Sequence, residues 1–230
     1  MLASQSPARL RYRALPMTFR AAIFDLGGVV FPSPFDVFDE YERNHGLPPR
    51  FIRTVVASST DHGAWGRLER SEYTFDQFCE AFATECREAG GEVDARELMM
   101  QIGRGFSPRP EMMQAITSIR AHGLKVAALT NNWARTDTAA DDVPHSMGHL
   151  GAFDVVVESA VEGLRKPDPR IYTLVCDRLG ITPNEAVFLD DLGVNLKPAR
   201  EMGMTTIKVV DATSALAELE TVLGFRLDGS

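Results

Sequence analysis

The chain has 230 residues and a formal net charge of −8, and 44% of its residues are hydrophobic and 24% are charged. This length suits one domain, or one domain with a small insertion, around a core of its own. The acidic balance argues against non-specific nucleic-acid binding, which needs a basic surface. It does not exclude an anionic small substrate, because a bound metal ion can invert the local field.

The three cysteines, Cys79, Cys86 and Cys176, do not form a disulfide framework. Cys79 and Cys86 are on one predicted helix at a spacing that separates them by about 10 Å, too far for a bridge. Scattered thiols are typical of a reducing compartment, so we expect a cytoplasmic protein. No apolar run approaches the roughly 18 residues of a membrane span.

The amino-terminal segment, residues 1–16, contains Arg9, Arg11 and Arg13 and no acidic residue. Transit peptides have this composition, but the segment is short and Met17 could be the original start. We expect a disordered extension, with a targeting segment as the alternative.

Residues 20–24 form an apolar run with β-branched and aromatic members, which predicts a buried parallel strand. Such a strand delivers the residue at its carboxyl end into the crevice where ligands bind, and here that residue is Asp25. Gly27 and Gly28 follow, and they let the backbone turn sharply and approach a ligand closely.

Residues 33–107 carry one helical pattern after another and no strand-like alternation, between proline-rich joints at 31–34 and 107–110. We expect an all-helical insertion here, with Trp65 in a glycine-flanked turn. Its predicted helices are 35–44, 50–58, 74–89 and 94–102.

From residue 108 onward strands and helices alternate, and an acidic N-cap followed by proline, Asp168-Pro169, marks one helix start. This alternation predicts an α/β fold: a Rossmann-like, doubly wound parallel sheet, built from residues 17–32 and 108–230. A polar loop is expected at 136–151. The remaining strands are predicted at 125–130, 153–159, 185–189 and 205–210, and the helices at 111–122, 169–180, 195–203 and 213–223.

Polar groups follow three of the predicted strands, and a lysine precedes one predicted helix. They are Asp25, the pair Thr130-Asn131, the pair Asp190-Asp191, and Lys166. A carboxylate can attack phosphorus and form an aspartyl-phosphate. Mg²⁺ prefers carboxylates, waters and substrate phosphate as ligands. A metal, a hydroxyl and an ammonium group together neutralise phosphoryl oxygens, so the set suits phosphoryl transfer.

This set, in this order, resembles the haloacid dehalogenase-like (HAD) superfamily with a type-1 helical cap, over residues 20–225. Residues 166–172 and 188–197 resemble the subgroup of HAD domains found in soluble epoxide hydrolase and in acyl-CoA dehydrogenase family member 10. The resemblance implies that residues 33–107 are the cap, which controls substrate specificity.

The resemblance also implies roles for single residues. Asp25 is the expected nucleophile, and Thr130 with backbone amides around Asn131 is expected to bind the phosphoryl oxygens. Lys166 is expected to hold nucleophile and phosphate together.

For the metal, the resemblance implies Mg²⁺ bound by Asp25, Asp190 and the main-chain carbonyl of Gly27, with Asp191 ligating through water or orienting the site. In family members an aspartate at the position of Gly27 acts as general acid and base. That group is missing here, and its contribution is typically about 10²–10⁴-fold in rate. The loss matters most for alkyl phosphates, whose leaving groups are poor, and less for anomeric or acyl phosphates.

Each of these residues also has a structural interpretation. Asp25 could end a turn, Thr130 could cap a helix, Lys166 could be solvated, and Asp190-Asp191 could favour a helix dipole. Two adjacent carboxylates beside a third repel one another without a cation, which favours the metal site.

Other residues suggest weaker hypotheses. His145 and His149, near Asp141 and Asp142, could suggest a transition-metal site, but their predicted loop does not ensure helical geometry. In the insertion, Trp65, Arg67 and Arg104 are candidate substrate contacts, with packing as the alternative for Trp65 and ordinary surface exposure for the arginines.

The sequence therefore predicts a Mg²⁺-dependent phosphatase for a small organic phosphate, without nucleic-acid or membrane-spanning partners. One alternative is a catalytically weak binding or regulatory domain, motivated by Gly27. A hydrolytic dehalogenase is less favoured, because that reaction needs no metal and leaves Asp190-Asp191 unexplained. A lipid phosphate, a phosphorylated hydroxy acid and a sugar phosphate all remain candidate substrates, and the sequence indicates no oligomeric state.

Overall fold

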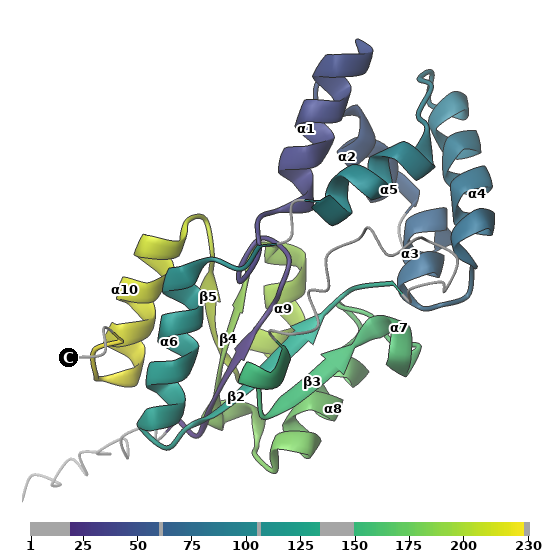
Figure 1. Ribbon diagram of the computed structural model, residues 1–230. Helices are drawn as coiled ribbons and strands as arrows, with labels where there is room; N and C mark the ends of the chain where they lie inside the picture. Colours follow the sequence, from purple (N-terminus) through teal and green to yellow (C-terminus); the bar gives the residue numbers. More distant parts are fainter. Residues whose placement is uncertain (1–18, 60–61, 105–106, 134–149, 228–230) are drawn as a thin grey trace, which may run out of the picture.

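Five parallel strands form the central sheet in the computed structural model, which describes residues 19–59, 62–104, 107–133 and 150–227 (Figure 1). The strand order across the sheet is β3-β2-β1-β4-β5. The predicted parallel, doubly wound sheet is thereby confirmed. The strands are β1 (Ala21–Phe24), β2 (Lys125–Thr130), β3 (Val155–Glu158), β4 (Ala186–Asp190) and β5 (Thr205–Lys208).

Helices cover both faces of the sheet, because alternate residues of each strand point to opposite faces. On one face, Ala22 and Phe24 of β1 pack against α6 (Pro110–Ala121) and α10 (Ala212–Leu223). On the other, Ala21 and Ile23 pack against α8 (Pro169–Leu179) and α9 (Gly193–Glu201). Every residue of β1 is buried, which explains its uninterrupted apolar sequence.

The carboxyl edge of the sheet brings the predicted polar groups together. Strand β1 pairs with both β2 and β4, and Phe24 lies in register with Ala128 and Leu189. The next residues after Phe24 and Leu189 are Asp25 and Asp190, so these two carboxylates end neighbouring strands. The chain connections run in opposite directions from this point, which is where open α/β sheets bind ligands.

Five helices between β1 and α6 form a separate group with their own apolar core, beyond the carboxyl edge of the sheet (Figure 1). Ser33 caps the first of these helices and Pro34 begins it, while Thr74 and Gln77 form a reciprocal capping box on the fourth. We call this group the helical region. It consists of α1 (Pro34–His45), α2 (Phe51–Ser59), α3 (Ala64–Glu69), α4 (Phe75–Glu88) and α5 (Ala95–Arg104).

The prediction of a turn around Trp65 is wrong, because this segment forms helix α3 and Gly66 lies inside it. The predicted strand 153–159 is shorter than expected, since Ser159 begins a further short helix, α7 (Ser159–Glu162). A three-residue 3₁₀ helix, Pro183–Glu185, precedes β4. The amino-terminal extension and most of the loop with His145 and His149 lie outside the described residues.

The helical region contacts the sheet domain through α3 and the turn after it. The Arg165 Nε–Glu69 Oε2 distance is 2.6 Å, in an ion pair that is mostly buried. The hydroxyl of Ser71 donates to the carbonyl of Ala160 at 2.8 Å. The ring of Trp65 meets that of Trp133 edge to face, with centroids 6.2 Å apart.

No helix in the described parts of the chain is both long enough and apolar enough to cross a bilayer.

Candidate active site

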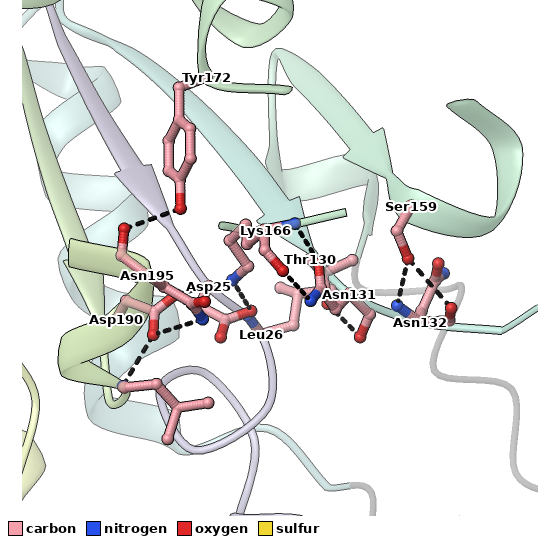
Figure 2. A network of polar contacts seen from close by, with 11 residues as sticks. Asp25, Leu26, Thr130, Asn131, Asn132, Ser159, Lys166, Tyr172, Asp190 and Asn195 are labelled. Atoms are coloured by element: carbon pink, nitrogen blue, oxygen red, sulfur yellow. Dashed lines mark hydrogen bonds and ion pairs between the residues drawn. The ribbon is translucent and has the colours of Figure 1, made fainter. Parts of the chain in front are cut away.

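A buried lysine joins the carboxylates that end β1 and β4 (Figure 2). Its Nζ lies 2.9 Å from Asp25 Oδ1 and 2.7 Å from Asp190 Oδ2. Lys166 is 1% exposed and Asp190 is fully buried, so this ion-pair network is shielded from solvent screening. The backbone amide of Leu26 also donates to Asp25 Oδ1, at 2.7 Å. Among the described residues, no hydrogen bond is donated to Asp25 Oδ2.

Asp190 is fixed by groups from α9 and the turn before it. Asn195 Nδ2 lies 3.1 Å from each carboxylate oxygen, and the amide of Leu192 donates to Oδ1 at 2.8 Å. The carbonyl of Asn195 in turn accepts from the hydroxyl of Tyr172, at 2.7 Å (Figure 2). Asn195 is not among the site residues predicted from the sequence, although its place one turn after the acidic pair was the available signal.

Asn131 positions the segment that carries Lys166. Its side chain forms two hydrogen bonds with the backbone of Lys166: Nδ2 donates to the carbonyl at 3.0 Å, and Oδ1 accepts from the amide at 2.8 Å. Thr130, at the end of β2, is 4% exposed, and among the described residues its hydroxyl makes only a long 3.4 Å contact with the Asn131 carbonyl. Within the described residues the Thr130 hydroxyl is therefore weakly engaged, whereas both polar atoms of the Asn131 side chain are hydrogen-bonded to the backbone of Lys166.

The turn after β1 approaches Asp191 closely. Gly28 has a φ of +78°, and a Cβ on it would lie 2.3 Å from Asp191 Oδ2. Arg109 supports this turn from behind, donating to the carbonyls of Gly28 and Val29 at 3.2 Å each. Gly28 is therefore required both by its left-handed backbone and by the close approach of Asp191.

Three carboxylates gather in this site, and their electrostatics favour a cation. Asp25, Asp190 and Asp191 each offer an oxygen, and these oxygens lie within 4.8 Å of one another. Burial raises the pKa of Asp25 well above its usual value, and Asp190 and Asp191 add to the rise while Lys166 opposes it. Burial and the neighbouring Asp190 likewise raise the pKa of Asp191 to about 6.

The positive charge of Lys166 partly offsets the negative charge of the carboxylates in the site. Burial disfavours its charged form, but Asp190 and Asp25 outweigh burial and raise its pKa above the usual value. One ammonium group facing three carboxylates leaves an excess of negative charge. A hard divalent cation with oxygen ligands, such as Mg²⁺, fits both this charge and this donor set.

The residues predicted as substrate contacts in the helical region lie in different surroundings. Trp65 is 7% exposed, packs edge to face against Phe38, Phe78 and Phe82, and donates to Glu69 at 3.1 Å. These contacts favour the packing interpretation of Trp65.

The two arginines differ from each other. The guanidinium group of Arg67 donates to the Tyr73 hydroxyl at 2.9 Å and lies over its ring. Arg104 is exposed in the last turn of α5. A substrate-contacting role for either one stays a prediction.

Comparison with known proteins identifies relatives along most of the chain. The family model for haloacid dehalogenase-like hydrolases matches residues 19–203. Acyl-CoA dehydrogenase family member 10 of Mus musculus is 41% identical over 213 residues, which cover 91% of this chain and 20% of that protein. Bifunctional epoxide hydrolase 2 of Rattus norvegicus is 37% identical over 218 residues, covering 90% of this chain and 39% of that protein. The chain thus spans less than half the length of these two relatives.

Two further relatives match over most of their own length. Phosphatase MT3486 of Mycobacterium tuberculosis is 34% identical over 202 residues, covering 82% of this chain and 86% of that protein. The structure of L-2-haloacid dehalogenase from Xanthobacter autotrophicus, with chloropropionic acid covalently bound, superposes with a TM-score of 0.57 at 26% identity. That match covers 89% of this chain and 83% of the dehalogenase. The relatives therefore include both a phosphatase and a dehalogenase.

Proposed function

Because the chain belongs to the haloacid dehalogenase-like hydrolases, we propose that it is a Mg²⁺-dependent phosphatase that hydrolyses a small organic phosphate through an aspartyl-phosphate. One observation carries the proposal: the Asp25 carboxylate lies 2.9 Å from Lys166, beside two more carboxylates. A dehalogenase also uses an aspartate nucleophile, but its reaction needs no metal. The excess negative charge of the three carboxylates, which favours a bound cation, therefore has no role in that reaction. The likeness to Phosphatase MT3486 supports the same choice.

In this proposal Asp25 attacks phosphorus through Oδ2, since Oδ1 is held by Lys166 and by the amide of Leu26. The bond between phosphorus and the leaving oxygen breaks in the same step, and the leaving group departs as an alcohol after taking a proton from water. Lys166 offsets the negative charge of the phosphoryl oxygens and keeps the carboxylate oriented. Thr130 contributes its weakly engaged hydroxyl to the same oxygens, with backbone amides around Asn131. Water then cleaves the aspartyl-phosphate, which releases inorganic phosphate and restores Asp25.

Asp25, Asp190 and the main-chain carbonyl of Gly27 would hold the metal, with Asp191 as a further carboxylate beside it. Bound there, Mg²⁺ supplies positive charge to the transferring phosphoryl group. The protein's own contribution is orientation: Asn195 and the amide of Leu192 fix the Asp190 carboxylate. Replacing Asn195 is therefore expected to misorient Asp190 and to weaken metal binding.

We further propose that the helical region is a cap that covers the site and selects the substrate. The contacts of Glu69 with Arg165, and of Ser71 with Ala160, support this role because they join α3 and the turn after it to Arg165 and to α7, which follows the carboxyl end of β3. The proposed boundaries are residues 33–107 for the cap, and 17–32 with 108–230 for the core.

Gly28→Ala tests the metal site through the turn that presses on Asp191. The left-handed backbone alone costs about 1–2 kcal/mol in a residue with a Cβ. The new methyl group would also push on Asp191, so we expect a further loss of stability and a higher Mg²⁺ requirement for activity. Gly123→Ala is the matched control, because Gly123 has a φ of +84° with nothing within 4 Å of the added Cβ. Equal melting temperatures and equal Mg²⁺ curves for the two variants would contradict this expectation.

Gly27→Asp tests whether the missing acid limits the enzyme. A Cβ on Gly27 would lie 3.6 Å from Pro34 Cδ, an ordinary contact, so a side chain fits at this position. We expect kcat for alkyl phosphates to rise at least about tenfold, since general acid catalysis is typically worth about 10²–10⁴-fold. Acetyl phosphate, whose leaving group needs no proton, serves as the control substrate and should change little. An equal change on both substrates would mean that Asp at position 27 does not act as the acid.

A substrate panel tests the proposed function directly. Acetyl phosphate, an anomeric sugar phosphate, an aryl phosphate and an alkyl phosphate are assayed with Mg²⁺ and with EDTA, beside 2-chloropropionate. Phosphate release from the first three that is lost in EDTA is the expected result. Halide release that survives EDTA would instead identify a dehalogenase. Mg²⁺ binding by calorimetry without turnover of any ester would identify the binding domain that Gly27 suggests.

A further inference from the structure

Arg53, in α2 of the helical region, has a buried hydrogen-bond donor without a described partner. Its guanidinium carbon lies 4.0 Å from the centroid of the Phe35 ring. Its Nε is buried and has no hydrogen-bond partner among the described residues. A buried donor without a partner is costly, and the cost is larger when the donor is charged. Such a group is expected to have a partner that is absent from the free protein.

The neighbours of Arg53 connect it to the active site. Phe35, on which its guanidinium group is stacked, directly follows Pro34, and Pro34 lies against Gly27 in the turn after β1. Arg53 therefore lies at the part of the helical region that adjoins the turn after β1, the turn that follows Asp25.

Three other arginines of the helical region have partners within that region. Arg67 donates to Tyr73, Arg70 pairs with Glu72, and Arg96 pairs with Asp76. The environment of Arg53 is different because its guanidinium group stacks on an aromatic ring, which attracts the cation but accepts no hydrogen bond in the guanidinium plane. The planar fork of N–H donors is thus held in position for an anion.

We propose that Arg53 binds a second anionic group of the substrate, a carboxylate or a second phosphate on the leaving group. The inference rests on the proposed phosphatase function and adds the substrate class to it. In an in-line displacement the leaving oxygen points away from the attacking oxygen. Asp25 attacks from the sheet, so the leaving group extends toward the helical region, where Arg53 lies. The transferred phosphoryl group is already served by Lys166 and Thr130.

The test uses two aryl phosphates of matched shape, 4-carboxyphenyl phosphate and 4-carbamoylphenyl phosphate. Wild-type protein is expected to prefer the carboxylate ester in kcat/KM. Arg53→Gln should lower kcat/KM for that ester roughly 10- to 100-fold, the scale of hydrogen bonds to charged groups, and should change the carboxamide ester by less than about twofold. Arg53→Lys, which keeps the charge but loses the fork, should recover part of the loss. Arg43→Gln, an exposed arginine of α1, is the control and should leave both esters unchanged.

The outcomes separate this inference from the proposed function. Wild-type turnover of both esters, with Arg53→Gln losing activity on neither or equally on both at an unchanged melting temperature, overturns the role of Arg53 and leaves the phosphatase intact. No phosphate release by wild-type protein from either ester, or from acetyl phosphate, overturns the phosphatase and the inference with it. If Arg53→Gln unfolds, Arg53→Lys decides: an unchanged ratio between the two esters contradicts the proposal.

Discussion

Asp25→Asn is expected to reduce phosphate release by about 10⁴-fold or more, the scale on which removal of a covalent nucleophile acts. Asparagine keeps the shape of the side chain and can still accept the hydrogen bond from the amide of Leu26. It has no anionic oxygen to attack phosphorus. The measurement is phosphate release from acetyl phosphate at saturating Mg²⁺.

The same substitution should not unfold the protein. Burial and two neighbouring carboxylates already disfavour the charged form of Asp25, so a neutral amide relieves repulsion when no metal is bound. We expect a melting temperature in EDTA equal to or above that of the wild type. Asp177→Asn, at an exposed position of α8, is the control for both measurements. Residual activity within tenfold of the wild type in folded Asp25→Asn would exclude Asp25 as the nucleophile.

Lys166→Met is expected to lower turnover strongly and also to destabilise the fold. The ammonium group of Lys166 forms ion pairs with both Asp25 and Asp190, and all three side chains are buried. Removing one partner of a buried ion pair typically costs about 3–5 kcal/mol, because the remaining charge is left uncompensated. Loss of a charge that stabilises the transition state should lower kcat by about 10³-fold.

Mg²⁺ distinguishes the two effects of Lys166→Met. Because a divalent cation supplies positive charge to the same carboxylates, we expect Mg²⁺ to restore part of the lost stability but not the activity. Denaturant unfolding with Mg²⁺ and with EDTA measures the first, and phosphate release the second. Lys125→Met is the control, since Lys125 is exposed at the start of β2 and its ammonium group donates to the carbonyl of Leu179, away from the three carboxylates. A Lys166→Met protein as stable as this control in EDTA would show that the three carboxylates do not need the lysine.

The sheet and the convergence of Asp25, Lys166 and Asp190 could be predicted from the sequence, and the structure confirms the sheet. Buried parallel strands are continuous apolar runs, and each run here stops at a polar residue. Because the carboxyl ends of parallel strands share one edge of the sheet, the proximity of residues far apart in sequence could be predicted without knowledge of their contacts. The chemical roles of these residues remain proposals.

What the sequence could not predict depends on tertiary contacts. Helix α3 has six residues with glycine inside it, so its local preference is weak and its packing through Trp65 decides its structure. The pair formed by Glu69 and Arg165 joins residues 96 positions apart. Arg53 gives no sequence signal, because an arginine on a helix normally faces solvent.

The ion pair between Glu69 and Arg165 has a consequence that follows from chain connectivity. Arg165 is bonded directly to Lys166, whose backbone Asn131 clamps from the other side. If α3 moved outward, either the ion pair would break or the peptide that carries the Lys166 ammonium group would be pulled along. An outward movement of α3 that kept the ion pair would therefore also displace Lys166 from Asp25.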